Sequence, residues 1–377
     1  MYADPEKLKI GLLFSDTGAT SLIEASQKKG ALLAVKEINN MGGLLGKEIE
    51  VIATDPASTP KLFAEHAAYL ISRGCTAIFG CYMSSARKAV LPIVENEKSL
   101  LFYPTLYEGF EYSKNCIYTG SSPNQSASVL ADYLTKNFDT DYLFVGSDYI
   151  FPHEINRVMV DLLGNRNARV KREIYIPLNA KPSDIQSVIK KIKRSGEVAI
   201  FSTVIGTTAI EFARAYHEAG FDREKMPVAS LTFGELDAQQ AGFDASQGYI
   251  KVSPYFSEIR TNVNHRFTAA FKKTYGDDQA IAAETEASYS QIHLFAEAVK
   301  RCGNIKRSNI LAALSTFTYD APQGVIQIDE ESHHTYVWPK IGICNSAGKF
   351  NIVKSSPCRV KPDPYLINHS FYARHHS

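Results

Sequence analysis

The sequence predicts an α/β protein made of two doubly wound lobes, each built on a parallel sheet. Short apolar runs of strand length alternate with amphipathic helical stretches from near the first residue onward. The runs lack the in-and-out alternation of a half-exposed sheet, which indicates strands covered on both faces. The alternation restarts in the second half of the chain, and 377 residues suffice for two domains.

The first half of the chain carries four expected strands, at residues 9–14, 48–53, 77–79 and 100–103. Between the first two, apolar residues recur at helical spacing from Ala31 to Ile38, and the pair Gly42-Gly43 ends the predicted helix. A second helix is expected before Gly74 and a third over 87–94. This order is the repeated βα unit of a doubly wound fold.

The second half repeats the pattern, with strands expected at residues 142–145, 170–176, 198–201, 228–231 and 249–256. We expect Ser183 to cap one helix and a second helix to span about 207–218. The cationic run 190–194 falls in the last turn of the first helix. A solvated helix end explains it better than a nucleic-acid patch.

The tail of the chain reads as antiparallel β structure. Strands are expected at 325–328, 336–344 and 350–353, and Asn345–Gly348 has the composition of a hairpin turn.

Composition excludes several classes of protein. Lys and Arg number 41 against 40 Asp and Glu, so the net charge of +1 gives no general attraction to nucleic acid or to an anionic membrane. No apolar run approaches the roughly 20 residues of a transmembrane helix. The first residues lack a basic region followed by an apolar one, so we expect a cytoplasmic protein; the alternative is a periplasmic protein shown in its mature form. The six cysteines form no C-x-x-C pair, which favours buried free thiols over zinc or disulfides.

Hydroxyl-bearing residues follow five of the predicted strands, and open α/β sheets bind ligands at the carboxyl ends of their strands. A hydroxyl can donate or accept a hydrogen bond, so such a cluster suits a small neutral ligand with both a carbonyl and N–H groups. Tyrosine rings would add apolar walls. Singly, each residue is better explained as a helix cap or a packing residue. All five strand ends together favour a binding site.

Signatures of catalysis are weak. The sequence contains no G-x-S-x-G, no P-loop and no G-x-G-x-x-G motif. His333 and His334 are adjacent and not at metal-ligand spacing, and Cys81 lacks a recognisable base. We therefore expect no catalytic residue, no metal and no cofactor, and an amidohydrolase is the rival enzyme hypothesis.

Several strand-end motifs together carry a resemblance to a known family. They are Gly80-Cys81-Tyr82-Met83-Ser84, Tyr103-Pro104-Thr105, Tyr107-Glu108-Gly109-Phe110-Glu111-Tyr112 and Gly146-Ser147-Asp148-Tyr149. In this order, and with further matches over nearly the whole chain, the sequence resembles the type I periplasmic-binding-protein fold. More narrowly, it is similar to the amide-sensing negative regulators of aliphatic amidase operons and to the receptors of urea or short-chain-amide ABC transporters.

The resemblance implies two lobes joined by a three-strand hinge, with the ligand cleft between them. We expect residues 1–121 and about 256–330 in the N-terminal lobe, and 122–255 and about 331–377 in the C-terminal lobe.

The resemblance also implies the ligand contacts. Ser84 and Thr105 would hydrogen-bond the amide, and Thr232 would contribute from the second lobe. Three tyrosines would line the pocket, Tyr82, Tyr103 and Tyr149. Leu106 stands where the amide-sensor pattern usually has proline. Its branched side chain would alter the pocket volume, so acetamide itself is not assured as the ligand.

The expected function is therefore a ligand-gated switch without catalysis. It would sense a small neutral amide and regulate amidase expression through an antiterminator protein, touching neither nucleic acid nor membrane itself. The alternative is the substrate-binding receptor of an ABC transporter for urea, short-chain amides or branched-chain amino acids. The oligomeric state stays open, with a homodimer among the alternatives.

Overall fold

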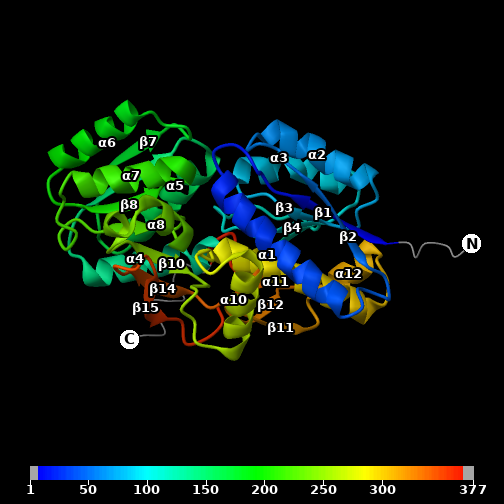
Figure 1. The fold of residues 1–377 in the computed structure, drawn as a ribbon. Coiled ribbons are helices and arrows are strands. Elements are labelled where there is room, and N and C mark those ends of the chain that lie inside the picture. Colours follow the sequence, from blue (N-terminus) through cyan, green and yellow to red (C-terminus); the bar gives the residue numbers. More distant parts are fainter. Residues whose placement is uncertain (1–6, 368–377) are drawn as a thin grey trace, which may run out of the picture. The chain divides into compact units, whose positions relative to one another are not determined.

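The computed structural model describes residues 7–367 and divides the chain into two compact units. Unit 1 comprises Met1–Thr105, Tyr112–Gly120 and Ile259–Tyr336, and unit 2 comprises Leu106–Glu111, Ser121–Glu258 and Val337–Ser377. The chain thus passes between units after residues 105, 111, 120, 258 and 336. The passages after residues 120, 258 and 336 separate long segments. The other two passages, after residues 105 and 111, begin and end the short segment 106–111. The predicted two-lobe α/β fold is confirmed (Figure 1).

Unit 1 is built on a five-stranded sheet of order β2-β1-β3-β4-β5 in which every pair is parallel. Its strands are β1 (Leu8–Leu13), β2 (Ile49–Thr54), β3 (Ile78–Gly80), β4 (Leu101–Tyr103) and β5 (Cys116–Tyr118). The first four lie within one or two residues of the predicted runs, whereas β5 was not predicted. Because all five run the same way, their carboxyl ends share one edge of the sheet.

The helices of unit 1 cover both faces of this sheet. They are α1 (Ser21–Asn40), α2 (Pro60–Ser72), α3 (Ser84–Asn96), α10 (Asn262–Tyr275), α11 (Ala283–Cys302) and α12 (Arg307–Leu314). Figure 1 shows α2 and α3 on one face and α1 and α11 on the other. Phe295 of α11 packs edge-on against Phe79 of β3 and Phe102 of β4, with ring centroids 5.4 and 5.9 Å away. This aromatic cluster anchors α11 to the middle of the sheet.

Helices α1 and α11 approach each other closely. A Cβ atom on Gly30 would lie 2.2 Å from the Thr285 backbone carbonyl oxygen, so no larger side chain fits there without a shift. One turn earlier, the Ser26 and Thr285 hydroxyl oxygens are 2.6 Å apart. The contact fixes α1, whose buried face carries polar residues to the strand ends described below.

A small antiparallel sheet completes unit 1. It contains β11 (Thr318–Ala321), β12 (Gly324–Ile328) and β13 (Thr335–Tyr336). The prediction placed residues 331–336 in the C-terminal lobe, which is wrong, because Thr335 of β13 pairs with Ile328 of β12. The expected strand 336–344 is in fact two strands, β13 in unit 1 and β14 (Lys340–Cys344) in unit 2.

Unit 2 contains a seven-stranded sheet of order β15-β14-β10-β9-β8-β6-β7. Its parallel strands are β6 (Tyr142–Ser147), β7 (Val170–Ile176), β8 (Ala199–Thr203), β9 (Val228–Ser230) and β10 (Ile250–Ser253). Strands β14 and β15 (Phe350–Ser355) extend this sheet antiparallel, and Asn345–Gly348 forms the turn between them, as predicted. The β-rich tail is therefore divided between two sheets.

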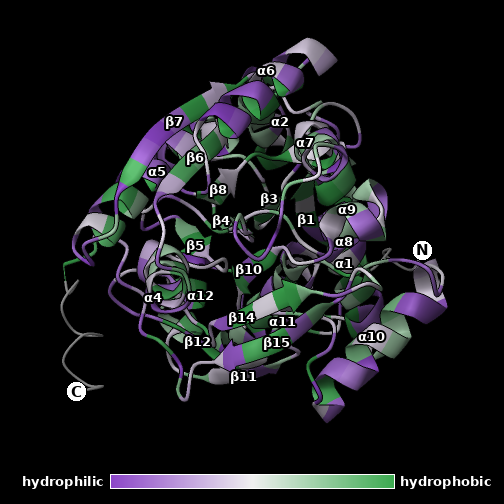
Figure 2. Cartoon of the chain, turned by 90° about the vertical axis from the view of Figure 1, so that its left-hand side faces the viewer, coloured by the Kyte–Doolittle hydropathy of each residue, from purple (hydrophilic) through white to green (hydrophobic). Residues whose placement is uncertain are grey.

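The helices of unit 2 are α4 (Ala127–Asn137), α5 (Ile150–Gly164), α6 (Pro182–Arg194), α7 (Gly206–Glu218), α8 (Glu235–Ala241) and α9 (Phe243–Ser246). A large apolar core joins α4 and α5 to the sheet. Helix α6 begins at Pro182, so the expected cap at Ser183 is wrong: the Asp184 carboxylate accepts from the Lys181 backbone N–H at 2.9 Å. The cationic run of α6 faces solvent, and Figure 2 shows this helix with hydrophilic and apolar positions alternating along it.

Residues 106–111 form the second correction to the predicted lobes, because they belong to unit 2. The Tyr107 backbone N–H donates to the Ser121 carbonyl, and the Phe110 N–H donates to the Pro364 carbonyl at 2.8 Å. These bonds tie the excursion to the unit 2 part of the chain.

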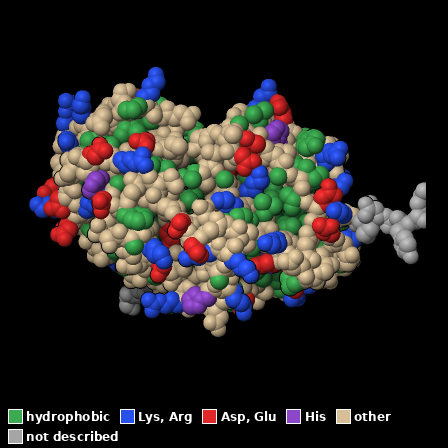
Figure 3. Space-filling model, in the orientation of Figure 1, with side chains coloured by type: hydrophobic (Ala, Val, Ile, Leu, Met, Phe, Trp, Pro, Cys, Tyr) green, Lys and Arg blue, Asp and Glu red, His purple; other side chains and the backbone are tan. Residues whose placement is uncertain are grey.

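The surface and the cysteines complete the description. Lys and Arg are interspersed with Asp and Glu on the face shown in Figure 3. No helix among residues 7–367 has the length and apolar character to cross a membrane. The six cysteines are free thiols. Four are buried, but Cys302 is half-buried and Cys358 is exposed, so the expectation of buried thiols is wrong for these two.

Candidate functional site

Four of the predicted ligand residues lie together at the carboxyl edge of the unit 1 sheet. Tyr82 and Ser84 follow β3, and Tyr103 and Thr105 end or follow β4. We call these four residues the hydroxyl cluster. All four are buried, with between 0% and 6% of each residue exposed. The strand-end argument therefore located a real group of neighbouring residues.

The turn after β3 shapes one side of the hydroxyl cluster. Cys81 has a left-handed backbone with φ +67°, which residues other than glycine rarely adopt. Its backbone N–H donates to the Leu13 carbonyl of β1 at 3.0 Å, which holds the turn against the neighbouring strand. Three residues further on, Ser84 is the first residue of α3. Its hydroxyl therefore lies at a helix N-terminus, where backbone N–H groups lack helical partners.

Hydrogen bonds tie the ends of β3 and β4 together. The Tyr103 hydroxyl donates to the Tyr82 carbonyl at 2.8 Å, and the Thr105 hydroxyl donates to the Cys81 carbonyl at 3.4 Å. The Tyr103 ring also packs edge-on to Tyr118 of β5, 6.3 Å between centroids. Tyr103 is fully buried, so its first role in this structure is to hold the strand ends in place.

Arg87 supports two members of the hydroxyl cluster from α3. Its Nη1 donates to Ser84 Oγ at 3.3 Å, and its guanidinium carbon lies 4.8 Å from the centroid of the Tyr103 ring. A guanidinium over an aromatic face is a favourable cation–π contact, and this one is buried. The Ser84 hydroxyl is thus oriented by a protein donor.

Sequence reasoning missed Gln27, which orients the other key hydroxyl. Gln27 lies on α1, is fully buried and donates from Nε2 to Thr105 Oγ1 at 3.1 Å. The signal was available, because Gln27 interrupts the apolar stripe of Ile23, Ala31 and Ala34 on the buried face of this helix. A polar residue on such a face needs a buried partner.

Glu24, one turn before Gln27, was missed for the same reason. Its carboxylate accepts from the Ser15 backbone N–H at 2.8 Å and from the Thr20 hydroxyl at 2.5 Å. Burial raises the pKa of Glu24 from 4.5 to about 7, although these two hydrogen bonds oppose the shift. The charge of Glu24 also contributes to raising the pKa of the Cys81 thiol, behind burial as the main cause. Cys81 therefore stays a neutral thiol, which does not suit a nucleophile.

The predicted residues of unit 2 occupy the carboxyl edge of its own sheet. Thr232 follows β9, is buried and donates from its hydroxyl to the Val204 carbonyl at 3.0 Å. Tyr149 is half-buried, precedes the first residue of α5 and packs partly against the unit 2 core. Asp148, which directly precedes Tyr149, is exposed, and its Oδ1 lies 2.8 Å from His153 Nε2.

Leu106 also belongs to unit 2 and packs partly against its hydrophobic core. Its proposed influence on pocket volume stays a prediction.

Glu235 is a buried carboxylate of unit 2 that sequence reasoning missed. Glu235 begins α8 and accepts from both the backbone N–H and the hydroxyl of Ser257, at 3.1 and 3.0 Å. Burial raises its pKa to about 7, against these hydrogen bonds and the nearby charge of Lys251. Lys251 is itself buried and donates to the Thr232 carbonyl at 3.5 Å.

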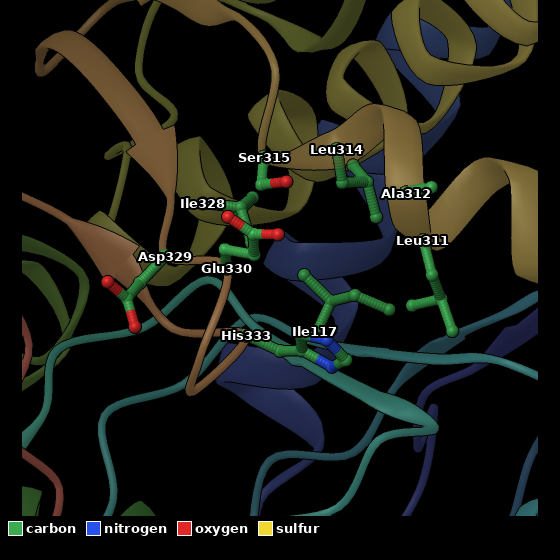
Figure 4. A pocket seen from close by; sticks show the side chains of 9 residues that line it. All are labelled: Ile117, Leu311, Ala312, Leu314, Ser315, Ile328, Asp329, Glu330 and His333. Carbon is green, nitrogen blue, oxygen red and sulfur yellow. The ribbon is translucent and has the colours of Figure 1, made fainter.

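A separate small pocket lies in unit 1 beside β5 and α12, with a volume of about 150 Å³ (Figure 4). Ile117, Leu311, Leu314 and Ile328 form its apolar side, and Glu330 and His333 its polar side. Figure 4 shows the Asp329 side chain apart from the others, where its carboxylate accepts from Ser332 at 2.8 Å. None of the predicted ligand residues lines this pocket. Across residues 7–367, no group of three or more His, Cys, Asp or Glu side chains could hold a metal ion.

Comparison with protein families assigns the fold to a known group. The family model described as periplasmic binding protein domain matches residues 8–370. The chain belongs to this family. A relative from Pseudomonas aeruginosa, the leucine-, isoleucine-, valine-, threonine- and alanine-binding protein, is 25% identical over 334 residues, covering 86% of this chain and 87% of the relative. Leu/Ile/Val-binding protein homolog 1 of Brucella abortus is 22% identical over 362 residues.

Solved structures with the same fold align with nearly the whole length of this periplasmic-binding-protein chain. A solute-binding protein of an ABC transporter from Rhodopseudomonas palustris, in complex with 3,4-dihydroxybenzoic acid, superposes with a TM-score of 0.84 at 23% identity, covering 94% of this chain and 99% of that one. A branched-chain amino acid transporter substrate-binding protein from Streptococcus pneumoniae, in complex with isoleucine, gives 0.81 at 20% identity, covering 95% and 100%. At these identities the likeness shows the fold alone.

One further match carries a different kind of name. A protein named limonene hydroxylase from Geobacillus stearothermophilus is 32% identical over 127 residues, which is 34% of this chain but only 23% of that protein. The match spans too little of that protein to bear on the activity of this one. The two relatives described above match over 87% and 93% of their own length, and both are named as binding proteins.

Proposed function

We propose that this periplasmic-binding-protein chain is a non-catalytic receptor for a small uncharged amide or urea. The observation that carries the proposal is a pair of buried hydroxyls at adjacent strand ends, Ser84 and Thr105, each of which accepts a hydrogen bond from a protein donor. Oriented hydroxyls recognise a carbonyl and an amide N–H together, because a hydroxyl serves both as donor and as acceptor. Burial excludes water, which strengthens each such bond.

Charge supports an uncharged ligand. The Glu24 carboxylate lies buried beside the same strand ends, and a second negative charge in such surroundings is unfavourable. A free amino acid needs a carboxylate for its ammonium group. In unit 2, Asp148 is exposed beside His153, and the Glu235 carboxylate already accepts two hydrogen bonds from Ser257. The branched-chain amino acid alternative remains in the test below, because named relatives bind such ligands.

We propose two alternative roles for the ligand-bound protein. The first is delivery to an ABC transporter, which the transporter receptors among the solved structures support. The second is the cytoplasmic amide sensor acting through an antiterminator protein, which the sequence Cys81-Tyr82-Met83-Ser84 and the Tyr107–Tyr112 stretch favour. In either case the ligand acts by binding one conformation more tightly than another. We propose Tyr149 and Thr232 as further ligand contacts.

Isothermal titration of the chain with acetamide, propionamide, urea and leucine tests the proposal. We expect saturable heat with at least one amide or with urea, and none with leucine. Saturation by leucine alone would replace the amide by an amino acid as the ligand. Absence of heat with all four would contradict the proposal. An ammonia assay after prolonged incubation with acetamide separates a receptor from an amidohydrolase, because a receptor returns the amide intact.

A further inference from the structure

We propose that the last turn of α6 and the adjoining edge of β7 form a docking surface for anionic phospholipid headgroups. The proposal goes beyond the proposed function, because it holds whichever small ligand the chain binds. It starts from the distribution of charge along the sequence. Residues 166–194 contain nine Lys or Arg against two Asp or Glu, a net charge of +7 in a chain whose net charge is +1. The overall balance therefore conceals one strongly cationic segment.

The cationic side chains at the end of α6 point away from the core of unit 2. The buried stripe of this helix ends at Ile192, in the middle of the cationic run. At about 3.6 residues per turn, Lys190 and Arg194 lie opposite that stripe, and Lys191 and Lys193 lie on its two sides. All four are exposed. Figure 3 shows Lys and Arg side chains gathered at the outer edge of unit 2, where Figure 1 places α6.

Strand β7 extends this cationic surface. It is the last strand of the unit 2 sheet, and its Arg172 is exposed. The neighbouring Lys171 Nζ donates to the carbonyl of Ser195, the residue that follows α6, at 3.4 Å. This bond brings the start of the strand beside the end of the helix. We call the following five residues the cationic patch: Arg172, Lys190, Lys191, Lys193 and Arg194.

The charge of the cationic patch is not neutralised within the protein. Among residues 7–367, no carboxylate forms a salt bridge with any of its five members. The nearest carboxylates in the sequence have other partners. Asp141 pairs with Arg169 and Lys171 at 2.7 and 3.1 Å, and Glu197 pairs with Lys225 at 3.1 Å. The helix dipole favours cations in the last turn of α6, but it does not account for Arg172 on the strand.

The surroundings of the cationic patch favour a partner that offers charge alone. Among the described residues, no large hydrophobic side chain between Ile150 and Phe243 is exposed. Tight protein interfaces draw most of their energy from buried aromatic and other large anchors, and single-stranded nucleic acids stack on aromatic rings. The patch offers neither feature.

A fluid lipid surface also suits the small size of the cationic patch. Residues 190–194 span only about 6 Å along the helix axis. The phosphates of a duplex nucleic acid are fixed along its length, so few of them would meet this patch. Anionic lipids move laterally and can gather beneath it. Each Lys or Arg near such a surface adds a similar increment of binding energy, and salt screens the attraction.

Sedimentation with lipid vesicles tests the proposal. The probes are phosphatidylcholine vesicles with and without about one-third phosphatidylglycerol. We expect the parent chain to bind only the anionic vesicles and to leave them at about 0.5 M salt. The double variant Lys190→Glu, Lys191→Glu should bind about thirtyfold more weakly or less, the factor that two lost cations are worth. Unfolding curves of each variant check that the fold is kept.

The matched control is the double variant Lys272→Glu, Lys273→Glu. These are two adjacent exposed lysines in the last turn of another helix, α10, so the change in net charge and the cost at the helix end are the same. This control should bind the anionic vesicles as the parent does. An equal loss in both double variants would show that net charge alone matters, which overturns the proposal.

Two results with the parent chain alone would also overturn it. The first is no binding to anionic vesicles at low salt, or equal binding to neutral ones. The second is release from the vesicles by duplex DNA or polyglutamate at equal charge concentration, which would assign the cationic patch to a nucleic acid or to an acidic protein. Retention on the vesicles in the presence of both competitors supports the lipid surface.

Discussion

The hydroxyl of Tyr103 donates to the backbone carbonyl of Tyr82 at 2.8 Å, joining the end of β4 to the turn after β3. Both residues were predicted to line a pocket by their rings. The structure shows that the hydroxyl of one fixes the backbone of the other. Tyr103→Phe should therefore lower the free energy of unfolding by about 1 kcal/mol, because it leaves a buried carbonyl without this donor.

Tyr142→Phe is the matched control for that substitution. The Tyr142 hydroxyl is buried without a hydrogen-bond partner, so its removal should be neutral or slightly stabilising. Chemical denaturation of the two variants measures the difference. Equal effects of the two substitutions would mean that the Tyr103 bond does not stabilise the strand ends.

Ser84→Ala and Thr105→Val should each weaken amide binding by about 1–3 kcal/mol, the cost of leaving a buried polar partner unpaired. In these variants Arg87 and Gln27, respectively, lose their acceptor inside the protein as well. Titration with acetamide measures the change. Full affinity in both variants would show that the amide binds elsewhere, with the pocket beside β5 as the next candidate.

Glu24 should make stability depend on pH. Its folded-state pKa of about 7 lies above the ordinary 4.5, so the folded state holds the proton more tightly than the unfolded state does. The stabilising contribution is fully present below pH 4.5 and is lost as the pH rises through 7. Glu24→Gln, which does not titrate, should therefore lose less stability across this window, by up to about 3 kcal/mol.

The comparison with the parent isolates Glu24 from other buried groups. Glu235 has a similarly raised pKa, so it also lowers stability as the pH rises. Burial lowers the pKa of His334 to about 4, so His334 instead lowers stability as the pH falls. Both groups are present in parent and variant, so their contributions cancel. Denaturation curves between pH 4.5 and 8 that stay parallel for parent and variant would contradict the prediction.

Gly30→Ala tests the contact between α1 and α11. The new methyl group would lie 2.2 Å from the Thr285 carbonyl oxygen, so the helices must separate, and a loss of about 1–3 kcal/mol of stability is expected. Gly164→Ala is the control, because nothing lies within 4 Å of a Cβ atom there. It should be neutral or stabilise by up to about 1 kcal/mol. Unfolding midpoints that shift alike would rule out a tight helix contact at Gly30.

The sheets could be predicted from the sequence because their strands are buried apolar runs. Val170–Ile176 coincides with its predicted run, and β1 to β4 lie within one or two residues of theirs. Strand β5 escaped prediction because its residues, Cys116–Tyr118, include one aliphatic side chain, Ile117, and so form no apolar run that stands out. Residues 336–344 were predicted as one strand although Pro339, which has no N–H to donate to a sheet, lies between β13 and β14 and marks the break.

The candidate site likewise contains residues that the sequence predicts and residues that it does not. That Ser84 and Thr105 lie near each other could be predicted because strand ends are ordered along one edge of a parallel sheet, while their contact with a ligand stays a prediction. Gln27 and Glu24 could not be assigned partners, because a helical stripe shows which face is buried and not which distant residue it meets. Thr105 is 78 positions from Gln27. Their presence on a buried face was the only local sign.

The most direct test of the account compares acetamide binding to the parent chain and to the double variant Ser84→Ala, Thr105→Val, by titration calorimetry at equal protein concentration. The account predicts one saturable acetamide site per chain in the parent and an affinity at least about thirtyfold lower in the double variant, which is the combined effect of two lost hydrogen bonds at about 1 kcal/mol or more each. A parent that binds neither acetamide nor another small amide, or a double variant that binds acetamide as tightly as the parent, would contradict it.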